Sequence, residues 1–133
     1  MSGNEYTPVG NGTEVGFLKL LQDANVPIHL LINLKLHVDE GFQILMRSAH
    51  TPEKKRSAIA IMCPTRPGTV IIYVKGAPEI LVGSCNAMIS SAQNGIENID
   101  AQDILRKVDK MADKPLRVIG MAYTEMSVSD WQQ

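Results

Sequence analysis

A turn rich in proline and glycine separates two apolar segments near the middle of the chain and restricts the possible folds strongly. The segments are residues 57–63 (SAIAIMC) and 70–75 (VIIYVK), and the linker is residues 64–68 (PTRPG). Proline restricts φ and glycine tolerates positive φ, so this linker is typical of a turn. We therefore predict an antiparallel hairpin, with residues 42–47 (FQILMR) as a further strand.

Helical patterns precede these strands. Thr13 is a candidate N-cap for a first helix that closes at residues 23–25, and apolar residues recur along one face of it. Pro27 suits the first turn of a second helix that runs to about Val38. That segment is apolar on most sides, and part of it can also be read as a strand.

Helical patterns return after the hairpin. Pro78 suits the first turn of a helix over residues 77–84, and Asp100 is a candidate N-cap for an amphipathic helix over residues 100–111. We expect residues 86–99 to be rich in loop, a last strand at residues 116–124, and flexible ends at residues 1–8 and 127–133. This order predicts one α+β domain over residues 1–133, with an antiparallel sheet flanked by helices.

Composition excludes several classes of protein. The 133 residues carry 13 Lys and Arg against 14 Asp and Glu, a net charge of −1, which argues against intrinsic disorder and against nucleic-acid binding. No stretch has the roughly 20 apolar residues of a membrane span, and no signal peptide is visible. Cys63 and Cys85 are expected to be reduced. The three histidines lack metal-ligand spacing, and no nucleophile elbow or catalytic triad appears.

Four segments combine charge with glycine or with an apolar strand, and each also has a plain structural interpretation. Lys75 leaves a strand and is followed by Gly76 and a helix start, which suits an anion, but it can equally be a lysine that snorkels from a strand end. The others are a basic turn after His50 (residues 54–56), Arg117 in an apolar strand, and the glycine-rich residues 10–14. Their plain interpretations are a solvated turn, a structural salt bridge and helix capping. By alternation, Arg117 would be half-buried and would need a partner.

Taken together, these segments resemble P-type ATPases, the ion pumps that are phosphorylated on an aspartate. The order and spacing of KGAPE (75–79), GNGTE (10–14), HTPEKKRSA (50–58) and LRVIGMAY (116–123) are similar to those of the family. The resemblance covers residues 9–126. It implies the nucleotide-binding (N) domain, whose family fold is an antiparallel sheet flanked by helices.

The resemblance also implies a nucleotide-binding role for six residues. Glu14 would contact the amino edge of adenine, and Lys55 and Lys75 would line the adenosine pocket. Gly76 would leave space beside the base, and Arg117 would approach the phosphates or the ribose. His50 stands where the family has a phenylalanine that stacks on adenine. This is a departure, and Pro52, Ser57 and Ala58 are further departures in the same segment.

The function that the resemblance implies is binding of ATP, with Mg²⁺ near the phosphates and held mainly by another domain. The DKTGT, TGD and GDGxND motifs are absent. We therefore expect part of a larger pump that binds ATP weakly, with a Kd nearer ~1 mM than ~1 µM. It would position the γ-phosphate for an aspartate of a separate phosphorylation domain without hydrolysing ATP alone, and no catalytic residue is assigned.

The expected partners are ATP and the phosphorylation and actuator domains of the same pump, with no nucleic acid and no direct membrane contact. The isolated domain would be a monomer, and its parent would carry it on the cytoplasmic face of a membrane. Residues 111–123 look most like plasma-membrane-type calcium pumps. Two other interpretations stay open: the N domain of a pump for another ion, and an N-domain-like interaction module that does not bind ATP.

Overall fold

The computed structural model describes residues 9–26, 39–90 and 95–133, and it divides into two compact units, residues 1–41 and 42–133. In the first unit, helix α1 (Gly12–Asp23) begins two residues earlier than an N-cap at Thr13 predicts. Asn11, not Thr13, is its N-cap, because the Asn11 side chain accepts a hydrogen bond from the Glu14 N–H at 3.0 Å. The predicted helix at 27–38 lies outside the described residues.

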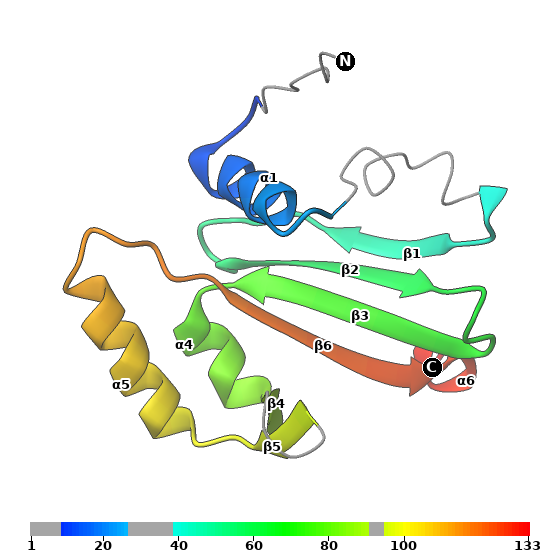
Figure 1. The fold of residues 1–133 in the computed structure, drawn as a ribbon. Coiled ribbons are helices and arrows are strands. Elements are labelled where there is room, and N and C mark those ends of the chain that lie inside the picture. The colour runs from blue at the N-terminus through cyan, green and yellow to red at the C-terminus, as the bar shows by residue number, and fades with distance from the viewer. Residues whose placement is uncertain (1–8, 27–38, 91–94) are drawn as a thin grey trace. The chain divides into compact units, whose positions relative to one another are not determined.

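The second unit is built on a four-stranded antiparallel sheet (Figure 1). Its strands lie in the order β1 (Gln43–Ser48), β2 (Arg56–Met62), β3 (Thr69–Gly76) and β6 (Gly120–Ser127). The predicted hairpin is confirmed as β2 and β3, and Gly68 has the positive φ of 80° that the turn requires. The α+β fold class is likewise confirmed.

Short helices pack beside this sheet. Helix α4 (Pro78–Leu81) continues into the 3-10 turn η1 (Val82–Ser84). Together these two elements cover the helix predicted at residues 77–84. Asp100 caps α5 (Ala101–Ala112) as predicted, because its side chain accepts a hydrogen bond from the Asp103 N–H at 3.0 Å. The core residues of the described chain come from the sheet and from α4 and η1: Ala60, Val70, Ile71, Leu81 and Val82.

Two expectations from the sequence need correction, and the flexible ends expected at residues 1–8 and 127–133 stay a prediction. Residues 86–99 are not loop throughout, because β4 (Ala87–Ile89) and β5 (Ile96–Asn98) form a small antiparallel hairpin. The last strand begins at Gly120 and not at residue 116, since its pairing with β3 starts opposite Gly76, where β3 ends. Residues 127–133 are described as the end of β6 and the short helix α6 (Val128–Trp131), which Ser127 caps through its side chain.

Two further observations bear on the classes considered above. No helix in the described ranges is long and apolar enough to cross a membrane. Both Cys63 and Cys85 are free thiols. The expectation of a single domain over residues 1–133 stays a prediction.

Candidate nucleotide-binding site

One end of the four-stranded sheet brings the predicted site segments of the second unit together. Here β1 ends at Ser48, β2 begins at Arg56, β3 ends at Gly76 and β6 begins at Gly120. Arg56, Gly76 and Gly120 stand in register across three neighbouring strands. We call this end of the four strands the site end of the sheet. It lies where β3 passes into α4 in Figure 1.

Each basic or glycine-containing segment of the second unit that was predicted to bind the nucleotide lies at this site end. His50 follows β1, Lys55 immediately precedes β2, Lys75 and Gly76 close β3, and Arg117 lies three residues before β6. The site end therefore collects five of the six predicted residues, listed here: His50, Lys55, Lys75, Gly76 and Arg117. Antiparallel pairing produces this convergence, because one strand ends where its antiparallel neighbour begins.

Glu14, the sixth predicted residue, belongs to the first unit. It is exposed in the first turn of α1, and its backbone N–H is capped by Asn11.

The turn that carries Lys55 is held by backbone hydrogen bonds. The Lys55 N–H donates to the Thr51 carbonyl at 2.8 Å, and the Lys54 N–H donates to Thr51 Oγ1 at 3.1 Å. Lys55 itself has a φ of 49°, in the left-handed region that residues other than glycine seldom adopt. Its carbonyl accepts a hydrogen bond from the Ala77 N–H at 3.0 Å, which joins the turn to the end of β3.

Gly76 is the residue that permits this junction. A Cβ placed on Gly76 would lie 2.5 Å from the Lys55 carbonyl oxygen and 2.8 Å from the Cα of Arg56. Both distances are well below the ~3.5–4.0 Å of an ordinary van der Waals contact. The structure thus gives Gly76 a steric role inside the protein, beside the role near the base that the resemblance implies.

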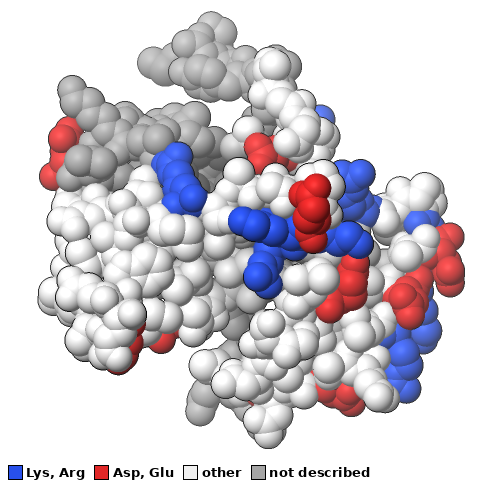
Figure 2. Space-filling model, turned by 180° about the vertical axis from the view of Figure 1, so that it is seen from behind, with Lys and Arg blue, Asp and Glu red and all other residues white. Residues whose placement is uncertain are grey.

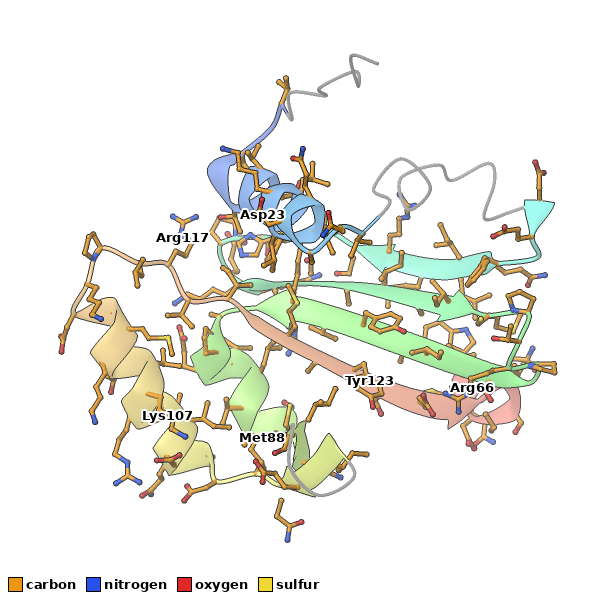
Figure 3. All side chains as sticks on the ribbon, in the orientation of Figure 1. Asp23, Arg66, Met88, Lys107, Arg117 and Tyr123 are labelled. Atoms are coloured by element: carbon orange, nitrogen blue, oxygen red, sulfur yellow. The ribbon has the colours of Figure 1, made fainter. Side chains whose placement is uncertain are left out.

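The basic side chains of the site end differ in exposure. Lys75 is partly buried and faces Ser57 and Met121 on the neighbouring strands, whereas His50 and Lys55 are exposed. The predicted half-burial of Arg117 is wrong: it is exposed because it precedes β6 and takes no part in strand alternation. Figure 3 labels Arg117 on the segment that leads into β6, at the opposite end of the sheet from Arg66.

The surface charge is mixed. On the face seen in Figure 2, Lys and Arg side chains gather with several carboxylates among them. At the far end of the sheet, Arg66 forms a bidentate salt bridge with Glu125, with Arg66 Nη2 2.8 Å from Oε2. This hydrogen-bonded pair, helped by the opposite charge, lowers the pKa of Glu125. On α5, a hydrogen bond from Lys107, opposed by some desolvation, lowers the pKa of Asp103.

A groove of about 750 Å³ lies along one face of the sheet, beneath α4 and α5. Its lining is mainly apolar, and none of the six predicted residues contributes to it. Ala58, Val74 and Ala122 stand in register on its floor, so alternation places Lys75 on the opposite face of the sheet. The groove and the site end share Arg56, the first residue of β2.

Sequence reasoning missed the groove, and it counted Arg56 in the basic turn without placing it on the groove face. The signal available for the groove was the spacing of Ile104 and Val108, four residues apart on α5, which both face it. For Arg56, the signal was its parity with Ala58 along β2, which puts both residues on one face.

The described residues do not offer a resident Mg²⁺ site. Magnesium prefers carboxylate and other oxygen ligands. Within residues 9–26, 39–90 and 95–133, no three acidic, histidine or cysteine side chains are grouped so that they could hold a metal ion. The site end instead carries cations, which favour an anionic ligand.

Comparison with known proteins identifies the family of this chain. The profile of the family described as P-type ATPase, cytoplasmic domain N, matches residues 1–133, the whole chain. Two similar proteins come from Oryza sativa subsp. japonica: the probable calcium-transporting ATPases 8 and 9, plasma membrane-type. Each is 35% identical over 75 residues, 55% of this chain, and the match spans 7% of the relative's length. The chain belongs to the family of P-type ATPase cytoplasmic N domains.

Proposed function

We propose that this chain binds ATP at the site end of its sheet and is the nucleotide-binding part of a calcium-transporting pump. The observation that supports the proposal most directly is the convergence of Lys55, Lys75, Gly76 and Arg117 from three separate segments. A triphosphate is a polyanion, and Lys and Arg side chains are the usual protein donors to phosphate oxygens. The names of the two rice relatives favour calcium as the transported ion.

The chemical contribution of such a domain is to position its substrate. Phosphoryl transfer needs the attacking and leaving oxygens in line, and little covalent chemistry falls to the protein. We propose that the γ-phosphate is held so that it reaches an aspartate on the phosphorylation domain of the same pump. Mg²⁺ would accompany the phosphates and be held mainly by that other domain, with the actuator domain as a further partner. The isolated chain would bind ATP without hydrolysing it and would stay monomeric, and the parent pump would carry it at the cytoplasmic face of a membrane.

His50 is proposed to take the stacking position on adenine. An imidazole ring offers a π-face, but it is smaller and more polar than the phenylalanine of the family. The exposure of the site end also makes its charges sensitive to salt. Both features support weak binding, with a Kd nearer ~1 mM than ~1 µM.

The test is a titration of the ¹⁵N-labelled chain with ATP, followed through backbone amide shifts. We expect shifts at the six proposed residues: Glu14, His50, Lys55, Lys75, Gly76 and Arg117. Their absence at millimolar ATP would contradict the proposal and favour an interaction module that keeps the fold without binding the nucleotide.

A pair of variants separates a specific site from general attraction between charges. Lys75→Ala should weaken ATP binding more than Lys54→Ala, because Lys75 is partly buried in β3 and Lys54 lies in a solvated turn. Each variant removes one positive charge, so the pair is matched in net charge. Equal losses of affinity would show that the pocket has been placed wrongly.

A further inference from the structure

Backbone contacts join the turn before β2 to the end of β3, and they run through Gly76. The Lys55 carbonyl oxygen lies only 2.5 Å from the position that a Cβ on Gly76 would take, and the residue after Gly76, Ala77, donates its N–H to that same oxygen. We propose that Gly76 is a positioning residue, which orients Lys55 for the nucleotide through the backbone of Lys55. The inference rests on the proposed ATP site and deepens it.

The steric demand at Gly76 is specific to this glycine. The atoms nearest to a Cβ placed on Gly76 are backbone atoms and a Cβ, at 2.5–2.8 Å. These atoms cannot rotate away as the end of a side chain can. At Gly120 the nearest atom is the terminal Cδ1 of Leu81, at 3.1 Å. Gly83 has nothing within 4 Å. A methyl group is therefore tolerated at residue 83 and must displace the turn at residue 76.

Displacement of the turn would reorient cations. Lys55 holds a left-handed φ of 49° between two hydrogen bonds, one from its own N–H to Thr51 and one from Ala77 to its carbonyl. A side chain on residue 76 pushes the carbonyl away and breaks the second bond. The Lys55 side chain then changes its orientation, and so does that of Arg56, because Arg56 is the next residue in the chain.

The experiment compares Gly76→Ala with the matched control Gly83→Ala in the full 133-residue chain. Before nucleotide is added, Gly76→Ala should move the amide signals of residues 51–58 and of Ala77, which Gly83→Ala should not do. In the titration with ATP, Gly76→Ala should raise the Kd about tenfold, and Gly83→Ala should keep it within about twofold; a tenfold loss is 1.4 kcal/mol.

A double-mutant cycle separates positioning from direct contact. Lys55→Ala removes the side chain but keeps a Cβ, so it leaves the backbone demand of residue 55 unchanged. If Gly76 acts through Lys55, the double variant should bind ATP no more weakly than Gly76→Ala alone. Gly76→Ala combined with Lys75→Ala should instead lose affinity multiplicatively.

A second variant covers the case in which Gly76→Ala does not fold. Ala77→Pro removes the N–H that donates to the Lys55 carbonyl, and Ala77 has a φ of −63°, which proline accepts. It should raise the Kd for ATP and show the same lack of additivity with Lys55→Ala.

The outcomes distinguish this inference from the proposed function. Wild-type affinity in both Gly76→Ala and Ala77→Pro would overturn the positioning role and leave the ATP site standing. Multiplicative losses with Lys55→Ala would also overturn it, because they would mean that Gly76 meets the nucleotide directly. A wild-type chain that does not bind ATP would overturn the proposed function and the inference with it.

Discussion

Replacing Leu81 by alanine is the sharpest test of how the site end is held together. Leu81 closes α4, is only 7% exposed, and approaches β6 where Gly120 leaves room for it. The substitution removes three carbon atoms, worth about 2.4 kcal/mol at ~0.8 kcal/mol each. Leu→Ala changes in cores cost about 2–5 kcal/mol, and the larger values come from unrelaxed cavities. Because Leu81 borders the groove, neighbouring side chains and water can enter the vacated space, so we expect about 2–3 kcal/mol.

The assay is urea unfolding with Leu116→Ala as the control. Leu116 undergoes the same chemical change but is 58% exposed, so its free energy of unfolding should stay within about 0.5 kcal/mol of wild type. The midpoint of Leu81→Ala should fall with an unchanged m-value. The reasoning is refuted if the two variants cost the same, or if Leu81→Ala is as stable as wild type.

Three further predictions concern other parts of the second unit. Asp100→Ala should cost about 1 kcal/mol in urea unfolding, because it removes the N-cap acceptor of the Asp103 N–H; no loss would deny that cap. Arg66 lowers the pKa of Glu125 in the folded protein. The pair therefore stabilises the fold fully above the ordinary glutamate pKa of about 4.3, and this stabilisation is lost as the pH falls through the lowered pKa of the folded state. Thermal midpoints of Glu125→Gln should therefore converge with wild type in acid, and a constant difference down to acidic pH would contradict the pair's role. Gly120→Ala should cost about 1–2 kcal/mol through contact with the end of Leu81, and a neutral result in the same assay would show that the leucine moves aside freely.

Local signals in the chain were sufficient for much of the fold. The PTRPG linker determines the β2–β3 hairpin, because proline and glycine restrict the backbone regardless of distant contacts. Asp100 determines the start of α5 for a similar reason, since its carboxylate reaches an N–H only three residues away. Such short-range chemistry can be read from the residues themselves.

Other features needed the partner strands. Residues 116–119 are as apolar as those that follow, yet β6 begins only at Gly120, because β3 has no residues left to pair with beyond Gly76. The small β4–β5 hairpin was missed since each of its strands has only three residues, too few for a periodicity. Arg117 is exposed because β6 begins only at Gly120, three residues after it.

Motif spacing and turn chemistry depend on neighbours along the chain, so the family resemblance, the hairpin and the residues proposed to bind the nucleotide can all be predicted from the residues alone. The left-handed conformation of Lys55 and the close approach of its carbonyl to Gly76 are visible only in the folded chain. The reason is physical: Lys55 and Gly76 are 21 positions apart, and their contact exists only once β2 and β3 have paired in register. Steric requirements of this kind arise from packing, and the chain alone does not display them.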